Sequence, residues 1–457
     1  MTSSILQSDA RSSDLTAIAE QMIARIAQHN PTLNAVIRHN PDAVRAEAAR
    51  LQDAYAAGQP MPLYGHTFTV KDNLWVAGEK ISQGSLLFRD FIAPEEAWAV
   101  ARLRQAGALY LGITNCSEFA CKGMTTNLLH GLTRHPQAPE LTPGGSSGGA
   151  AAALGVGIGD FALATDAGGS ARRPAAHCGL VGFKPSAGAI PLGPGFSEPV
   201  FGHGVIAPMA RCMTDLRSAF SVLAAFDPRD PASCSLPPAF AGNPIRIAFS
   251  PSLGLDVAID DSVRHGVENA VEALRAAGMS IAQVSPAWPD GLGEAGFMPL
   301  QYAGLAALYG ARYHQNPELF DPDIGRQIEA GLTLQGQDVA AALLLRETVA
   351  KTLARFFGDF DLLLCPTVPC TAWPATQLGP AQIGGRPAAP RDHAVFTPIF
   401  NQAGVPAISV PCGRDAAGLP FGMQIIARRF ADNFLLDFAA RAETIFAECG
   451  LWTGATA

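Results

Sequence analysis

Segments with helical periodicity and segments with strand-like composition alternate along this chain. Apolar residues recur at helical spacing over 15–26 and over 42–57, and helices are also expected from about 94 to 107, over 263–274 and across most of 291–357. Segments rich in β-branched and aromatic residues, which favour strands, lie at 66–71, 108–114, 161–165, 245–250, near 281 and at 361–369. Such alternation is typical of α/β proteins, so the sequence predicts an α/β fold.

The composition indicates a protein with a large core. Apolar residues are 48% of the chain and charged residues 16%, below the usual share of about 25%, which excludes intrinsic disorder. The net charge of −8 argues against a broad basic surface for nucleic acid. The most helix-like uncharged stretch, 295–311, is interrupted by proline and polar residues and falls short of a membrane span.

Compartment and domain number follow from equally simple features. No signal peptide is predicted at 1–14, and nine scattered cysteines are typical of reduced thiols, so we expect a cytoplasmic protein. At roughly 150 residues per domain, 457 residues suggest about three domains. However, neither a repeat nor a low-complexity linker is present, so we expect one domain over 1–457.

The segment 143–159 contains seven glycines and a run of alanines. Within it, GGSSG at 144–148 matches the G-x-S-x-G nucleophile elbow, but the preceding HPQAPELTP lacks the strand that this motif requires. A phosphate-binding loop is disfavoured because the Walker lysine is missing. The remaining structural interpretation is a loop that enters a tightly packed Ala/Gly helix.

A turn of small residues, DAGGS, follows the strand 161–165 and precedes a helix that we expect to begin near Ser170. Such a turn directs several backbone N–H groups into one small space, where they suit an oxyanion. Ser170 would then be the attacking hydroxyl. A strand-to-helix turn with a capping serine is an equally good interpretation of these residues alone.

The segment TVKDN at 69–73 places Lys71 at the end of an apolar strand. Most lysines are solvated at the surface, which is the simpler interpretation. A buried lysine differs, because desolvation lowers its pKa from about 10.4. A lysine that is neutral near pH 7 can act as a general base.

These segments, at this spacing, resemble the amidase signature family of serine hydrolases. Ser146 lies 75 residues after Lys71, and Ser170 lies 24 residues after Ser146, as in the family pattern. Further segments resemble the family in the same order, namely TNCSEFACKGMTTN, GLVGFKPSAG, PMARCMTDL and NQAGVPAISVP with GLPFGMQII. The resemblance covers most of the chain except roughly residues 280–350.

The resemblance implies a Ser-cisSer-Lys triad that works without metal or cofactor. Ser170 would be the nucleophile, Ser146 the bridging serine after a cis peptide bond, and Lys71 the base. Cleavage would pass through an acyl-enzyme, which water then hydrolyses. The implied oxyanion hole consists of the N–H groups of Ala167, Gly168, Gly169 and Ser170.

Supporting roles are implied for further residues. Ser147 would hydrogen-bond the lysine, Asp166 and Arg172 would hold the nucleophile turn, and the Ala120 carbonyl would accept a hydrogen bond from the substrate. Arg173 is less usual beside Arg172, and two roles stay open for it, a second structural cation or a group at the pocket edge.

The implied fold is a large mixed β-sheet covered by helices on both faces. N-terminal helices would occupy 1–60, the signature core with the catalytic residues 61–215, and a variable helical substrate-pocket region about 285–357. The apolar side chains of 297–309 could belong to the core or line that pocket.

Other patterns were weighed against simpler interpretations. Cys116, Cys121, His130 and His135 have a C-x4-C-x8-H-x4-H spacing, but the middle gap is short for a zinc finger. Cys365 and Cys370 are expected to be small core residues rather than a redox pair. His177 and His203 do not fit the order of a Ser-His-Asp triad with an elbow serine.

The expected activity is therefore hydrolysis of a small apolar or aryl amide, and the same machinery would serve a carbamate (urethane) or an ester. The expected partner is that small molecule, without nucleic acid or membrane, and a homodimer stays open. One alternative is the glutaminase-type amidase subunit of a tRNA-dependent amidotransferase. Another is a non-catalytic binding protein, which the intact set of Lys71, Ser146 and Ser170 disfavours.

Overall fold

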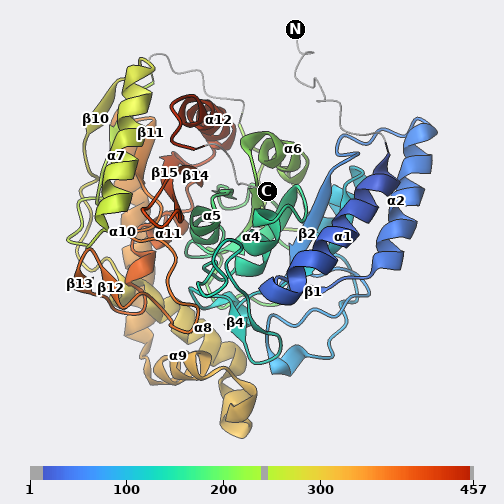
Figure 1. Cartoon of the computed structure of the whole chain (residues 1–457). Helices are drawn as coiled ribbons and strands as arrows, with labels where there is room; N and C mark the ends of the chain where they lie inside the picture. The colour runs from blue at the N-terminus through green and yellow to red at the C-terminus, as the bar shows by residue number, and fades with distance from the viewer. Residues whose placement is uncertain (1–13, 238–244, 453–457) are drawn as a thin grey trace.

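The computed structural model describes residues 14–237 and 245–452, and a single large sheet runs through it (Figure 1). Eleven strands of the described residues form this sheet. In spatial order they are β1 (Val36–Arg38), β3 (Leu109–Thr114), β2 (Thr67–Lys71), β6 (Phe161–Asp166), β8 (Val205–Ala210), β7 (Val181–Lys184), β14 (Ala407–Arg414), β15 (Pro420–Ala427), β11 (Leu362–Pro366), β9 (Ile247–Phe249) and β10 (Ile281–Gln283).

The sheet is mixed, as predicted. Strands β3, β2 and β6 run parallel at one end, and β11, β9 and β10 run parallel at the other. Antiparallel pairs through β8, β7, β14 and β15 join the two parallel groups. Two short hairpins lie outside the sheet, β4 (Thr126–Asn127) with β5 (Gly131–Leu132) and β12 (Gln382–Ile383) with β13 (Arg386–Pro387).

Helices lie on both faces of the sheet, again as predicted (Figure 1). The helices of the described residues are α1 (Leu15–Leu33), α2 (Pro41–Ala56), α3 (Trp98–Gln105), α4 (Gly148–Gly155), α5 (Arg172–Cys178), α6 (Met213–Leu223), α7 (Asp261–Ala276), α8 (Glu294–Gln315), α9 (Pro322–Thr333), α10 (Gly336–Asp359), α11 (Pro398–Gln402) and α12 (Asp432–Glu448). None of them is both long and apolar enough to cross a bilayer, within the described ranges.

The alternation of side chains along β6 shows how the two faces are covered. Ala162 and Ala164 pack with the alanines of α4 and α5 on one face. Phe161 and Leu163 belong to the main core on the other face, with residues of α3, α6, α7 and α12. Because residues two apart in a strand share a face, small residues let α4 and α5 approach the sheet closely.

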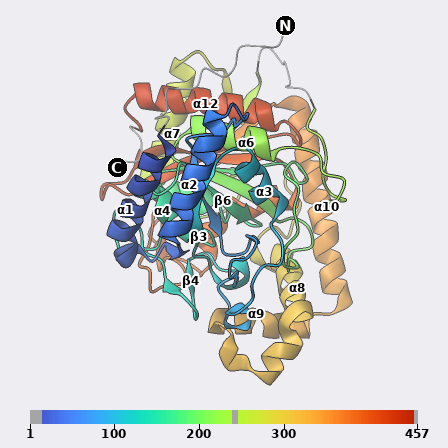
Figure 2. The ribbon, with the colours of Figure 1, turned by 90° about the vertical axis from the view of Figure 1, so that its right-hand side faces the viewer.

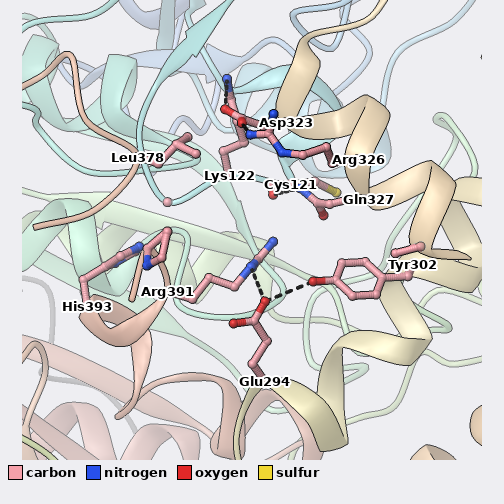
Figure 3. A pocket seen from close by; sticks show the side chains of 13 residues that line it. Cys121, Lys122, Glu294, Tyr302, Asp323, Arg326, Gln327, Leu378, Arg391 and His393 are labelled. Atoms are coloured by element: carbon pink, nitrogen blue, oxygen red, sulfur yellow. Dashed lines mark hydrogen bonds and ion pairs between the residues drawn. The ribbon is translucent and has the colours of Figure 1, made fainter. Parts of the chain in front are cut away.

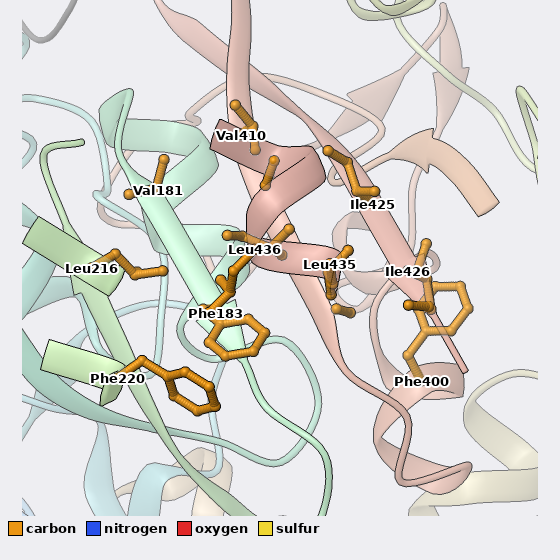
Figure 4. Close-up of a cluster of buried hydrophobic side chains, with 14 of the residues drawn as sticks. Val181, Phe183, Leu216, Phe220, Phe400, Val410, Ile425, Ile426, Leu435 and Leu436 are labelled. Carbon is orange, nitrogen blue, oxygen red and sulfur yellow. The ribbon is translucent and has the colours of Figure 1, made fainter. Parts of the chain in front are cut away.

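The main core lies between the central strands and helices α6 and α12. Phe183 on β7 packs there with Phe220 on α6, at a ring-centroid distance of 5.1 Å (Figure 4). Leu435 and Leu436 of α12 and Ile425 and Ile426 of β15 belong to the same cluster. These buried apolar side chains fix the central strands, whose neighbours β2 and β6 carry the residues described next.

The predicted helical region after residue 291 forms α8, α9 and α10. Helices α8 and α9 lie together at one end of the molecule in both views (Figures 1 and 2). The expected helix at 94–107 is shorter and begins at Trp98. Residues 94–97 are bends and irregular backbone, in which Ala97 N–H bonds the carbonyl of Trp75 rather than a helical partner.

Candidate active site

Lys71 is the last residue of β2 and is completely buried. Its Nζ lies 2.8 Å from Ser146 Oγ and 2.9 Å from Thr165 Oγ1. Burial lowers the pKa of this amine to about 8, and the nearby Asp166 charge partly opposes that shift. A solvated surface position, the simpler interpretation of the sequence, is therefore wrong.

Ser146 lies in the glycine-rich loop before α4, and the Gly145–Ser146 peptide bond is cis, as the resemblance implied. A Cβ on Gly145 would lie 2.7 Å from backbone atoms of Met124, so only glycine fits this approach of two backbones. The Ser146 carbonyl accepts hydrogen bonds from Ser117 N–H and Thr125 Oγ1, each at 3.3 Å. The loop therefore holds the Ser146 hydroxyl over Lys71.

Asp166 and Arg172 hold the turn that carries Ser170, as predicted. The Arg172 guanidinium donates to both carboxylate oxygens, with Nη2–Oδ1 at 2.9 Å and Nε–Oδ2 at 3.0 Å, and both side chains are fully buried. Burial opposes ionisation of Asp166, but Arg172 holds the pKa of the carboxyl well below its usual range. Asn401 Nδ2 also donates to Asp166 Oδ1, at 2.9 Å.

The peptide between Gly168 and Gly169 is held on both sides. Its carbonyl accepts from Thr397 Oγ1 at 2.8 Å and from Arg173 Nη1, while its N–H donates to Asp166 Oδ1 at 2.7 Å. The prediction that the Gly169 N–H is a free oxyanion donor is therefore wrong. Gly169 has φ +108°, and a Cβ there would overlap Thr397, so glycine is required for this arrangement.

The remaining predicted donors are placed differently. The N–H groups of Ala167, Gly168 and Ser170 donate to no protein acceptor among the described residues. These three groups are thus available to a ligand. Arg173 is a structural cation, because it also bonds Thr397 Oγ1 at 3.0 Å and the Gly145 carbonyl at 3.3 Å.

Ser170 lines a cavity of about 310 Å³, here called the Ser170 cavity. Its hydroxyl makes no hydrogen bond to Ser146 within the described ranges, so the structure contains the Lys71–Ser146 half of the predicted relay only. The Ser170 carbonyl accepts from Ser147 N–H at 3.2 Å, which keeps the two serine segments together.

Ser147 does not contact the lysine, and that prediction is wrong. Its hydroxyl donates to the Thr165 carbonyl at 3.3 Å, and the Thr165 hydroxyl takes the expected place beside Lys71. Thr165 Oγ1 also accepts from Asn73 Nδ2 at 3.0 Å. The sequence contained a signal for Thr165, because it lies near the carboxyl end of a strand that runs parallel to β2.

The wall of the Ser170 cavity is aromatic on one side. Phe196 lines the cavity and packs on Phe88 and Phe91, with ring centroids 4.9 and 5.0 Å away. Phe119 lines it as well and stacks on Tyr309 at 4.1 Å. The adjacent Ala120, the predicted substrate contact, also lines the cavity and has φ +61°.

A second cavity, of about 240 Å³, shares Cys121 with the first and is here called the Arg391 cavity. Glu294 lies between Arg391 and Tyr302, with Arg391 Nε at 3.3 Å and the tyrosine hydroxyl at 3.0 Å (Figure 3). Lys122 pairs with Asp321 at the same wall. Gln301, which lines the Ser170 cavity, donates to Gln327 of the Arg391 cavity at 2.6 Å and so links the two.

The apolar stretch at 297–309 belongs mainly to the core. Phe297, Leu300, Leu305 and Tyr309 are buried, whereas Leu308 is exposed. Tyr309 reaches the Ser170 cavity only through its contact with Phe119. The core interpretation is therefore the better one, with Gln301 as the direct contribution of α8 to that cavity.

The zinc and histidine patterns form no site. His130 Nε2 lies 3.9 Å from Asp72, whereas His135 Nε2 bonds the His177 carbonyl at 2.8 Å, and no metal-binding group of three or more candidate ligands occurs within 14–237 and 245–452. Burial lowers the pKa of both His177 and His203 to about 3. Cys365 and Cys370 are buried and free, as predicted.

Comparison with known proteins agrees with this geometry. A family model described as Amidase matches residues 17–436. An acylamidase of Rhodococcus erythropolis is 35% identical over 444 residues and covers 94% of this chain and 91% of its own length. The amidase-type subunit of glutamyl-tRNA(Gln) amidotransferase from Synechococcus sp. (strain RCC307) is 33% identical over 461 residues, with 93% of each chain covered.

The fold has close structural neighbours too. The crystal structure of a bacterial aryl acylamidase belonging to the amidase signature enzymes superposes with a TM-score of 0.87 at 28% identity, covering 96% of this chain and 94% of its own. A 6-aminohexanoate cyclic dimer hydrolase complexed with substrate superposes with a TM-score of 0.81 at 26% identity, covering 94% of each chain.

Proposed function

Because the chain belongs to the amidase signature family of amide-hydrolysing enzymes, we propose that it cleaves small aryl or apolar amides with Lys71, Ser146 and Ser170. The observation that best supports this proposal is the contact of 2.8 Å between the buried Lys71 amine and the Ser146 hydroxyl, behind the cavity that Ser170 lines. A lysine whose pKa lies near 8 is partly neutral at pH 7 and can take a proton.

In the proposed first step, neutral Lys71 takes the proton of Ser146, and Ser146 takes that of Ser170. The Ser170 oxygen forms a bond to the carbonyl carbon, and the carbonyl π electrons move to oxygen. Thr165 Oγ1 accepts hydrogen bonds from both Lys71 and Asn73, which leaves the amine lone pair directed to Ser146. The Ser146–Ser170 hydrogen bond forms in the substrate complex, since such bonds often tighten only there.

The tetrahedral oxyanion is bound by the N–H groups of Ala167, Gly168 and Ser170, which have no protein acceptor among the described residues. When the carbon–nitrogen bond breaks, Ser146 gives its proton to the leaving amine and takes one from the Lys71 ammonium. Water then attacks the acyl-enzyme with the same relay acting as base, and Ser170 leaves with the returned proton.

The aromatic wall supports an aryl or apolar substrate. Phe119 and Phe196 face the cavity, and aromatic surface of this kind binds flat apolar groups. The acylamidase and aryl acylamidase relatives agree with this class. Carbamates and esters present the same carbonyl to Ser170, and we include them in the proposed substrate range.

The amidase subunit of a tRNA-dependent amidotransferase is the second candidate, favoured by the Synechococcus relative. Glutamine carries an α-carboxylate, which calls for a cation in the pocket. Of the described residues that line the Ser170 cavity, none is lysine or arginine. Release of ammonia from glutamine, together with copurification of a second chain, would favour this candidate over a free amidase.

A hydrolysis panel tests the proposal. It contains aryl amides, alkyl amides, carbamates, esters and glutamine, with the Ser170→Ala variant as the blank. We expect Ser170→Ala to lose at least about 10⁴-fold in kcat on aryl amides while keeping its unfolding temperature. A fluorophosphonate should label the natural chain at Ser170, and an unlabelled Ser170 with Ser170-independent turnover would contradict the proposal.

A further inference from the structure

Glu198 lines the same cavity as Ser170, on the loop between β7 and β8. The carboxyl group is half-buried and lies directly against the backbone of Gly204, where a Cβ would overlap both carboxylate oxygens. Glycine at 204 therefore provides the space for this carboxyl group. The loop also carries Phe196, so the carboxyl group lies beside the aromatic wall.

This carboxyl group has no partner within the protein. Across 14–237 and 245–452, no N–H or O–H group donates to either oxygen of Glu198, and no cation forms an ion pair with it. Burial raises its pKa to about 7, and the charge of Lys71 partly opposes that shift. A half-buried carboxylate without a donor is costly, so a ligand that supplies a donor is favoured.

We propose that Glu198 selects amides that carry a protonated amino group, which it binds through a charge-assisted hydrogen bond while Ser170 attacks the carbonyl. This inference rests on the proposed amidase function, because it names the substrate class of that site. A primary ammonium is compact and carries three donors, which suits a single carboxylate beside aromatic side chains. One carboxylate is too few ligands for a divalent cation, and no acidic side chain other than Glu198 lines this cavity among the described residues.

Two matched substrate series test the inference. In the first, p-nitroanilides carry acyl chains that end in an ammonium or in a methyl group, over several chain lengths. In the second, the ammonium or methyl group ends the amine part instead. We expect the ammonium member of at least one series to have a kcat/KM about 10- to 100-fold above its methyl counterpart.

Variants then assign that preference to Glu198. Glu198→Gln should bring the ratio of kcat/KM values close to one, whereas Glu198→Asp should retain part of the preference. Because both substrates are measured on one preparation, the ratio does not depend on the folded fraction. The matched control is Glu443→Gln, a half-buried glutamate on α12 whose pKa burial also raises to about 7, and it should leave the ratio unchanged.

A measurement on the natural chain covers the case in which Glu198→Gln fails to fold. Alkylammonium ions should inhibit anilide hydrolysis at lower concentration than alkanols of equal length. Equal inhibition, a ratio near one in both series, or a preference that survives in Glu198→Gln would overturn the role of Glu198. Hydrolysis of the methyl-terminated amides would still support the amidase function, whereas the absence of any Ser170-dependent cleavage would overturn that function itself.

Discussion

Two cavities share Cys121, and they differ in how their charges are balanced. Around the Arg391 cavity, Arg391 pairs with Glu294, Lys122 with Asp321 and Arg326 with Asp323. In the Ser170 cavity Glu198 has no such partner within the described ranges, and the nearby Lys71 is bonded to hydroxyl groups instead. Paired charges fix structure, whereas an unpaired acid or a neutral amine is available to bind or to move a proton.

Removal of the Lys71 amine should separate the two regions most strongly. Lys71→Ala should lower kcat/KM on an aryl amide by about 10²- to 10⁴-fold at pH 7, because the relay loses its base. Partial recovery at high pH is expected, where hydroxide replaces the amine. Near-normal turnover of Lys71→Ala at pH 7 would show that the base is misassigned.

The buried pair beneath the nucleophile turn should dominate stability. Arg172→Met leaves the Asp166 carboxylate buried and uncompensated, so we expect the free energy of unfolding to fall by about 3–5 kcal/mol. Urea denaturation measures this change. The double variant with Asp166→Asn should lose less than the sum of the two single variants, and simple additivity would argue against a coupled pair.

The pH profile reports the charge of Lys71 directly. With a folded pKa of about 8, the neutral amine is about a tenth of the total at pH 7, so kcat/KM should rise about tenfold per pH unit below 8 and level off above it. Because the folded pKa lies below the unfolded value, burial of Lys71 favours folding above pH 10.5, and this contribution is lost as pH falls through about 8. A flat kcat/KM between pH 6 and 9 would contradict the assignment.

The Arg391 cavity should give the smallest effect. Arg391→Gln removes an ion pair whose side chains are 31% and 49% exposed, so the free energy of unfolding should change by about 0.2–1 kcal/mol. The kcat/KM ratio of ammonium to methyl substrates should stay the same in this variant. A large change in that ratio would mean that the two cavities bind one substrate together.

How much of this the sequence predicted depends on the distance between partners along the chain. Local patterns identified β2, α2 and the Ala/Gly helix α4, because periodicity and small residues are read within a few positions. The family spacing brought Lys71 to Ser146 correctly. Thr397 and Asn401 were missed, because their contacts to the turn at 166–173 span more than 200 residues.

The oxyanion turn shows the same limit at the level of single peptide groups. Sequence alone cannot tell that the Gly169 N–H serves Asp166, since the orientation of that peptide is fixed by Thr397 and Arg173. Glu198 was missed for a similar reason, because a loop rich in glycine and proline has no periodicity that would direct one side chain into a cavity.

The clamp on the nucleophile turn also affects how the protein is made. Arg172 bonds Gln424, 252 residues later, and the Gly168 carbonyl bonds Thr397, 229 residues later. A nascent chain on the ribosome therefore carries its serines long before it contains the residues that orient them. The enzyme should stay inert during synthesis and become competent only when its last strands have emerged and paired.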